Sequence, residues 1–147
     1  MADSRVQRQA EDWVRENWLL ATYGQRFRKR RLDLRSGGQF EFDGVSEDRK
    51  IVVAISTNGG VTSSGKKASP KLNKIRSDAL FLLLAEADKR LILFTDRAMF
   101  ELCDGEVRNG RFPPEVEIRL SEPPRELQEQ LREARAIAAD EVSPRSG

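Results

Sequence analysis

The sequence predicts an α/β (α+β) domain in which helices flank one central mixed sheet. Residues 51–56 read IVVAIS, a run of β-branched and small side chains that is typical of a strand buried on both faces. Residues 39–45, just before it, alternate phenylalanine with acidic side chains, which is the period of two of a strand. From residue 70 to 87, apolar side chains recur at helical spacing. Helical and strand patterns that alternate along one chain favour helices packed on a sheet.

The first two-thirds of the chain contain one helix, three strands, a second helix and a fourth strand. The first helix is expected over residues 4–21, with a stripe of Val6, Ala10, Trp13, Val14, Asn17 and Leu20 or Ala21, and Gly24 is placed to end it. Ser69 and Pro70 form a cap and first turn for the second helix. The four strands are expected over residues 28–34, 39–45, 51–57 and 91–95, and the second helix over residues 70–87.

The last third adds a strand and helices to this αβββαβ core. Asp96 can cap a short helix over residues 98–102 that Asp104 and Gly105 end. Residues 116–120 alternate as an outer strand does, and the two prolines at 123 and 124 begin a last helix. We therefore expect a single domain over residues 1–139, followed by a disordered polar tail over residues 140–147.

The composition excludes several classes of chemistry. The 147 residues contain no histidine, which removes Ser-His and Cys-His catalysis and most zinc sites. Any metal would have oxygen ligands, which favours Mg²⁺ or Mn²⁺. A single cysteine, Cys103, cannot form an internal disulfide. There is no signal-peptide pattern, and the longest apolar run, residues 79–85, is too short to span a bilayer. We expect a cytoplasmic protein without a membrane partner.

Basic residues gather in two zones although the formal net charge is only +2. In residues 26–35, six of ten side chains are Arg or Lys, which suits either a solvated edge strand or a stripe that binds phosphates. Residues 49–76 contain seven basic side chains and no acidic one. The residues expected to contact nucleic acid are Arg26, Arg28, Lys29, Arg30, Arg31, Lys66, Lys67 and Lys71.

Asp43 ends one expected strand and lies beside the middle of the next, where Ala54, Ile55 and Ser56 stand. This order resembles the PD-(D/E)xK superfamily of metal-dependent nucleases, the restriction-endonuclease-like fold. The resemblance implies that Asp43 matches the first acid of that family, and that Ala54-Ile55-Ser56 occupies the position of its acid-x-Lys triplet. In the family two carboxylates hold Mg²⁺ and the lysine helps to activate a water. Ala54 and Ser56 supply neither group, so the site is degenerate.

An active site with relocated groups is the alternative. Glu41 precedes Asp43 by two positions and points to the same side of a strand, so it could be the second metal ligand beside Asp43. Lys66, Lys67 or Lys74 could replace the missing lysine; such migration is known in the family that the chain resembles. Lys74 and Asp78, one helical turn apart, are also expected to form a plain salt bridge. Mg²⁺ or Mn²⁺ is implied only if the site is active; otherwise no cofactor is expected.

Three functions follow from these observations. The first is a catalytically degenerate, nuclease-like domain that binds DNA or other nucleic acid and assists its processing. The second is an active nuclease with Asp43, Glu41 and a relocated lysine. The third is a structural or protein-interaction module, as a homodimer or with a protein partner. Basic residues that converge near Asp43 favour the first two, whereas scattered basic residues favour the third.

Overall fold

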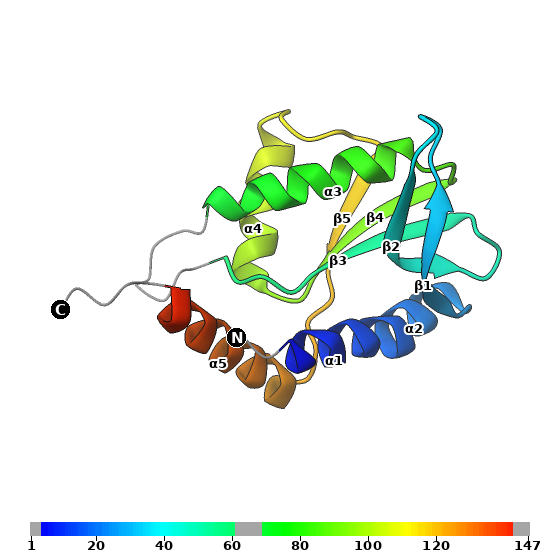
Figure 1. Ribbon diagram of the computed structural model, residues 1–147. Helices are drawn as coiled ribbons and strands as arrows, with labels where there is room; N and C mark the ends of the chain where they lie inside the picture. The colour runs from blue at the N-terminus through cyan, green and yellow to red at the C-terminus, as the bar shows by residue number, and fades with distance from the viewer. Residues whose placement is uncertain (1–3, 61–68, 143–147) are drawn as a thin grey trace.

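One mixed sheet forms the centre of the fold. The computed structural model describes residues 4–60 and 69–142, and within them five strands pair in the order β1-β2-β3-β4-β5 (Figure 1). The β1–β2 and β2–β3 pairs are antiparallel, whereas β4 runs parallel to β3 and β5 parallel to β4. This confirms the predicted class and the order αβββαβ. The strands are β1 (Phe27–Asp33), β2 (Gln39–Ser46), β3 (Ile51–Ser56), β4 (Lys89–Phe94) and β5 (Val116–Leu120).

Strand β3 is the interior strand that its sequence predicts. All six of its residues are buried, and it pairs with β4 along its whole length, from Ile51 opposite Lys89 to Ser56 opposite Phe94. Alternate side chains enter two separate cores. Val52 and Ala54 join the core that includes buried apolar residues of α3 (Leu72–Leu84) and α4 (Arg97–Arg108). Val53 joins the core under the N-terminal helix, which comprises residues 5–23.

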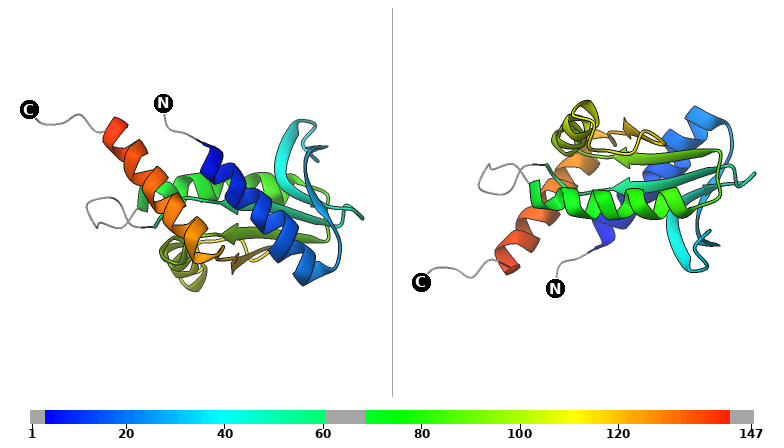
Figure 2. Two further views of the ribbon diagram at one scale, coloured as in Figure 1. Left: turned by 90° about the horizontal axis from the view of Figure 1, so that it is seen from below. Right: turned by 90° about the horizontal axis from the view of Figure 1, so that it is seen from above.

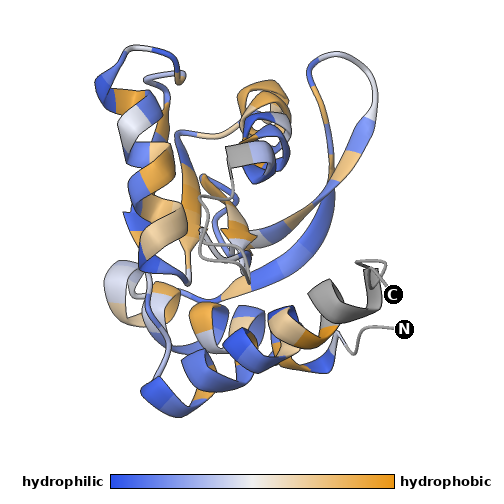
Figure 3. Cartoon of the chain, turned by 90° about the vertical axis from the view of Figure 1, so that its left-hand side faces the viewer, coloured by the Kyte–Doolittle hydropathy of each residue, from blue (hydrophilic) through white to orange (hydrophobic). Residues whose placement is uncertain are grey.

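The helices cover both faces of the sheet. Figure 2 shows the N-terminal helix and α5 side by side on one face, and α3 with α4 on the other. Hydrophobic and hydrophilic bands alternate along these helices, as expected of elements with one buried side (Figure 3). The helical segments are α1 (Arg5–Trp13), η1 (Val14–Leu19), α2 (Leu20–Tyr23), η2 (Ser69–Lys71), α3 (Leu72–Leu84), α4 (Arg97–Arg108) and α5 (Arg125–Val142).

The N-terminal helix changes its period where η1, a π-helical segment, begins. Val14 and Leu19 are both fully buried although they are five residues apart, which is the spacing of a π-helix. The α-helical stripe predicted for residues 4–21 is therefore wrong after Val14: Asn17 is exposed, and 41% of Leu20 is exposed. Gly24 ends the helix in the left-handed conformation (φ 68°), as expected.

Three other boundaries differ from the sequence-based expectation. Helix α3 ends at Leu84 because Ala85 becomes extended and pairs with Leu34. Helix α4 continues through Gly105 to Arg108, since buried Glu106 lies on its inner side and is held by arginines. Helix α5 reaches Val142, so the first three residues of the expected tail over 140–147 are helical; residues 143–147 lie outside the described part.

Candidate functional site

Strands β2 and β3 separate at Asp43, and this fork defines the candidate site. Their ladder contains only Gly44 opposite Val53 and Val45 opposite Val52 (Figure 1). One residue beyond, the Oδ2 atom of Asp43 accepts a hydrogen bond of 2.8 Å from the Ile55 amide. At this point the β2 backbone has moved away from β3, so the Ile55 amide has no ladder partner in β2. The Asp43 carboxylate accepts the hydrogen bond from this amide instead.

Side chains from α1 and η1 surround Asp43 on one side. The Nη1 of Arg15 donates to the Asp43 carbonyl oxygen at 2.8 Å, while its Nη2 contacts the Asp12 carboxylate at 2.6 Å. Burial raises the pKa of Glu11, and the negative charge of Asp43 raises that pKa further; Lys29 and Arg15 oppose this. Glu11 is therefore a member of the site that the sequence analysis did not include.

An ion pair of α3 includes a carboxyl that responds to the charge of Asp43. The Nζ of Lys74 lies 2.6 Å from Oδ1 of Asp78, which confirms the predicted salt bridge. Burial raises the pKa of Asp78 although Lys74 opposes the shift, and the charge of Asp43 adds a smaller rise. Lys74, one of the candidate relocated lysines, is held by Asp78, and the Asp78 carboxyl in turn responds to the charge of Asp43. Arg15 contacts Asp43 directly, whereas Glu11 and Asp78 are linked to it through the effect of its charge on their pKa.

The two triplet positions on β3 hold no group that could replace the missing acid and lysine. Ala54 and Ser56 are each 5% exposed. Ala54 packs in the core shared with α3 and α4, and the Oγ of Ser56 has no hydrogen-bond partner within the described residues. Among residues 4–60 and 69–142, no three Asp, Glu or Cys side chains are arranged to hold a metal ion.

The remaining candidate catalytic residues lie apart or outside the described chain. Glu41 is exposed on β2, and its carboxylate pairs with the Lys29 ammonium 3.7 Å away across the ladder with β1. Lys66 and Lys67 fall in the undescribed segment 61–68. Lys71 is exposed at the end of η2, just before α3. A role of Glu41 as a metal ligand stays a prediction.

The first basic zone forms an exposed edge. Strand β1 pairs only with β2, and its basic side chains are exposed apart from the partly buried Arg30. Lys29 pairs with Glu41, but in the described part of the chain no carboxylate forms an ion pair with the four arginines Arg26, Arg28, Arg30 and Arg31. In the β1–β2 ladder Arg30 lies opposite Phe42, the residue before Asp43, which places this edge beside the fork.

The second basic zone does not form one surface. Arg49 and Lys50 occupy the turn before β3, whereas Lys71 and Lys74 follow the other end of that strand. Lys74 is paired with Asp78, and Arg76 with Glu106 at 3.2 Å. Among residues 4–60 and 69–142, only the β1 zone therefore supplies a group of cations without acidic partners near Asp43.

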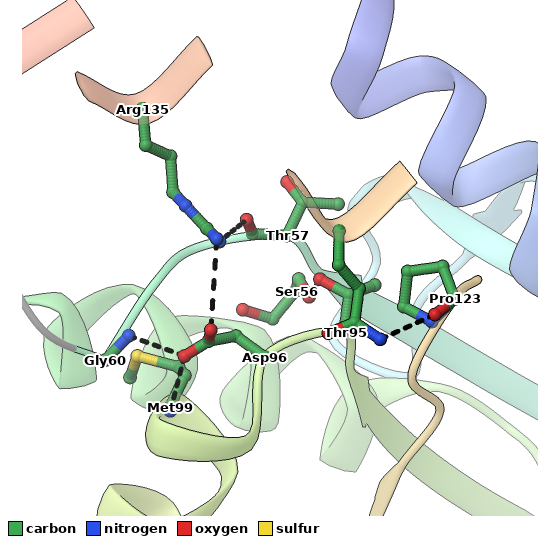
Figure 4. Close-up of polar contacts among 9 residues, drawn as sticks. Ser56, Thr57, Gly60, Thr95, Asp96, Met99, Pro123 and Arg135 are labelled. Atoms are coloured by element: carbon green, nitrogen blue, oxygen red, sulfur yellow. Dashed lines mark hydrogen bonds and ion pairs between the residues drawn. The ribbon is translucent and has the colours of Figure 1, made fainter. Parts of the chain in front are cut away.

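The C-terminal ends of β3 and β4 are closed by α5, a feature that the sequence did not reveal (Figure 4). The Nη1 of Arg135 donates to the Thr57 carbonyl oxygen at 2.9 Å, and its Nη2 lies 3.8 Å from Oδ1 of Asp96. Asp96 caps α4 through the Met99 amide at 3.0 Å, as predicted, and also accepts from the Gly60 amide at 2.8 Å. In α/β sheets ligands usually bind at this edge; here the chain's own helix occupies it.

Glycine is required at residue 60 for this closure. A Cβ atom there would lie 2.3 Å from the Ala98 carbonyl carbon and the Met99 nitrogen, so the β3 loop could not approach α4 as closely. Burial lowers the pKa of Arg135, and the Asp96 charge opposes the shift. A partly buried guanidinium with a carboxylate and a carbonyl as partners indicates a structural latch between α5 and the sheet.

Comparisons with known proteins identify no relative, so the assignment of the candidate site rests on the geometry described above. Protein-family models, curated proteins and solved structures each gave no match to the chain. In the described residues no helix is both long and apolar enough to cross a membrane.

Proposed function

We propose that the chain is a nuclease-like domain of the PD-(D/E)xK type that binds nucleic acid without cleaving it. The order αβββαβ and an aspartate at the fork of β2 and β3 support the family resemblance. The buried Ala54 and Ser56 support the loss of cleavage, because neither can hold a metal or activate a water. A cytoplasmic location and DNA as the partner belong to this proposal.

The observation that carries the binding function is the arginine edge of β1. Arg26, Arg28, Arg30 and Arg31 lie on or next to an edge strand with no ion-pair partner in the described chain. A guanidinium is always charged and its planar fork matches phosphate oxygens. Four such groups beside the fork would place a phosphate backbone along β1, and binding would release counterions.

The geometry at Asp43 argues against catalysis in the same region. One carboxylate oxygen already accepts the Ile55 amide, and Ala54 offers no second carboxylate. Mg²⁺ prefers octahedral oxygen coordination and gives up its water reluctantly, so one partly engaged carboxylate is a weak anchor. No cofactor is needed for the proposed binding function.

An active nuclease is the second candidate, and one observation favours it. The Lys74–Asp78 pair, 2.6 Å long, supplies a lysine and an acid from α3, and the charge of Asp43 acts on the pKa of Asp78. Together these would provide two carboxylates and a lysine, the groups that Mg²⁺- or Mn²⁺-dependent hydrolysis uses. The third candidate, an interaction module or homodimer, is favoured if the arginine edge binds no nucleic acid.

The test of the proposal is binding of duplex and single-stranded DNA, measured by fluorescence anisotropy over a range of salt concentrations. Binding that weakens steeply with salt and depends on Arg30 and Arg31 supports the proposal. Absence of binding at low salt overturns it in favour of the interaction module.

A further inference from the structure

A pocket beside the fork shares Arg26 and Arg28 with the arginine edge, and a ligand site in it goes beyond the functions discussed so far. It lies between the N-terminal helix and the start of β1 and has a volume of about 400 Å³. That size is in the range of about 300–1,000 Å³ that is common for small-ligand sites. Six residues line this arginine pocket: Arg15, Glu16, Leu20, Arg26, Phe27 and Arg28.

The π-helical segment η1 shapes one wall of the arginine pocket. Because a π-turn repeats after five residues, Val14 and Leu19 both point into the core. Arg15 and Leu20 have the same five-residue spacing, and both line the pocket. A regular α-helix would separate these two side chains by about 140° around the helix axis. The irregular helix therefore places a cation and an exposed apolar side chain together.

The three arginines differ in how firmly they are held. Arg15 has a side chain only 14% exposed, and it is fixed by the Asp43 carbonyl and the Asp12 carboxylate. Arg26 and Arg28 are exposed, and neither forms an ion pair with a carboxylate in the described residues. With Glu16 as the single acid, the lining carries three positive charges and one negative charge. The pocket thus offers the guanidinium groups of Arg26 and Arg28 to a ligand, next to the guanidinium of Arg15, which is already held in place.

The rest of the lining is apolar. Phe27 lies between the two exposed arginines and is 6% exposed, so its ring belongs to the core below the pocket. Leu20 is 41% exposed, although large apolar side chains of this kind are usually buried. A ligand that fits must therefore combine a concentrated negative charge with an apolar or ring-shaped part.

We propose that the arginine pocket binds a terminal phosphomonoester joined to a sugar and base. This is the chemistry of a nucleotide and equally of the phosphorylated end of a nucleic-acid strand. A monoester carries a charge of about −1.5 to −2 at neutral pH, more than an internal diester, and has three acceptor oxygens for guanidinium forks. If the ligand is the phosphorylated end of a nucleic-acid strand, the proposal rests on the proposed nucleic-acid function. If the ligand is a free nucleotide, it does not.

The experiment compares ligands that differ only in the phosphate. Anisotropy titrations use one oligonucleotide with a 5′-phosphate, a 3′-phosphate or hydroxyl ends, and calorimetry compares adenosine monophosphate, adenosine and inorganic phosphate. We expect one phosphorylated strand, or adenosine monophosphate, to bind roughly tenfold tighter than its hydroxyl counterpart. Arg26→Gln with Arg28→Gln should remove that difference. Arg30→Gln with Arg31→Gln, outside the pocket, should weaken both strands alike and keep their ratio.

The outcomes separate the pocket from the proposed function. Strands that bind with equal affinity whatever their ends, together with no binding of adenosine monophosphate, would overturn the pocket and leave the β1 edge intact. Adenosine monophosphate binding without strand binding would support the pocket for free nucleotides and refute the nucleic-acid function. Chemical-shift changes at the Leu20 methyl groups of the unmodified protein provide a readout independent of any variant; their absence at saturating phosphorylated ligand would contradict the assignment.

Discussion

The Asp43 carboxylate and the Ile55 amide are joined by a hydrogen bond of 2.8 Å where β2 leaves β3. In this position the aspartate completes the hydrogen bonding of a strand that is buried throughout. The Asp43 side chain therefore has a structural role that does not depend on a metal. The family resemblance treats the same residue as a metal ligand, and the structure gives it a second, structural task that can be tested separately.

Replacing Asp43 should cost stability irrespective of any activity. Asp43→Ala leaves the Ile55 amide without a partner, and we expect a loss of about 1–3 kcal/mol in the free energy of unfolding. Asp43→Asn keeps an acceptor oxygen and should cost less. Glu41→Ala, at an exposed carboxylate two residues earlier, is the control and should change stability by under about 0.5 kcal/mol. Urea denaturation measures all three; equal losses for Asp43→Ala and Glu41→Ala would contradict the structural role.

Burial of Glu11 should make its contribution to stability depend on pH. Its pKa is raised in the folded state, by burial first and by Asp43 second, so the folded protein binds its proton more readily than the unfolded chain does. The unfolding free energy should then fall as the pH rises above 4.5, the ordinary pKa of a glutamate. Glu11→Gln removes this dependence, so the variant should gain stability relative to the wild type towards pH 7.

The comparison requires denaturation curves between pH 4 and pH 7 for the wild type, Glu11→Gln and Glu86→Gln, the last being a change at an exposed glutamate after α3. Only the Glu11 variant should show a difference from wild type that grows with pH. A difference that is constant across this range would show that Glu11 does not titrate as inferred.

The sequence predicted the architecture well because its strongest signals are local. The β-branched run of residues 51–56 and the cap at Asp96 need no distant partner to be recognised, and both were confirmed. The expected helix break at Gly105 was wrong because tertiary contacts override a weak local preference: Glu106 lies inside and is held by Arg76 and Arg111.

The candidate site was less predictable because its members are far apart in sequence. Asp43 was expected to end a strand, but β2 continues to Ser46 and it is the ladder with β3 that stops beside Asp43; Lys74 with Asp78 was found from helical spacing. Glu11 carries no local signal that separates it from other helix glutamates, and its link to Asp43 depends on how α1 crosses the sheet. The π-helical turn also has no simple sequence pattern, so the position of Leu20 was expected on the wrong side.

The latch made by Arg135 should stabilise the docking of α5. Its guanidinium serves both the Thr57 carbonyl and the Asp96 carboxylate, so Arg135→Met removes a charged hydrogen bond worth about 1.5–3 kcal/mol. Arg132→Met, at an exposed position one turn earlier in α5, is the matched control and should have little effect. Thermal unfolding and amide exchange in α5 measure the outcome. Equal behaviour of the two variants would argue against the latch.

Incubation with DNA and either Mg²⁺ or Mn²⁺ should give no cleavage above background. The triplet positions lack the acid and the lysine that would stabilise charge in the transition state. Such stabilisation usually lowers the barrier by several kcal/mol, and each loss of about 1.4 kcal/mol slows the reaction tenfold. Supercoiled plasmid provides a sensitive nicking assay. Cleavage that disappears in Asp43→Asn and Lys74→Gln, but persists in the control Lys50→Gln at an exposed position before β3, would instead establish an active site built from β2 and α3.

The salt dependence of DNA binding tests the central claim most directly. If Arg30 and Arg31 contact phosphates, Arg30→Gln with Arg31→Gln should lower the slope of log affinity against log salt by about 2, since each duplex contact contributes about 0.9. Lys50→Gln with Arg125→Gln removes the same charge from exposed positions outside β1 and should leave the slope unchanged. Binding that is insensitive to salt, or slopes that fall equally in both double variants, would contradict a nucleic-acid interface on β1.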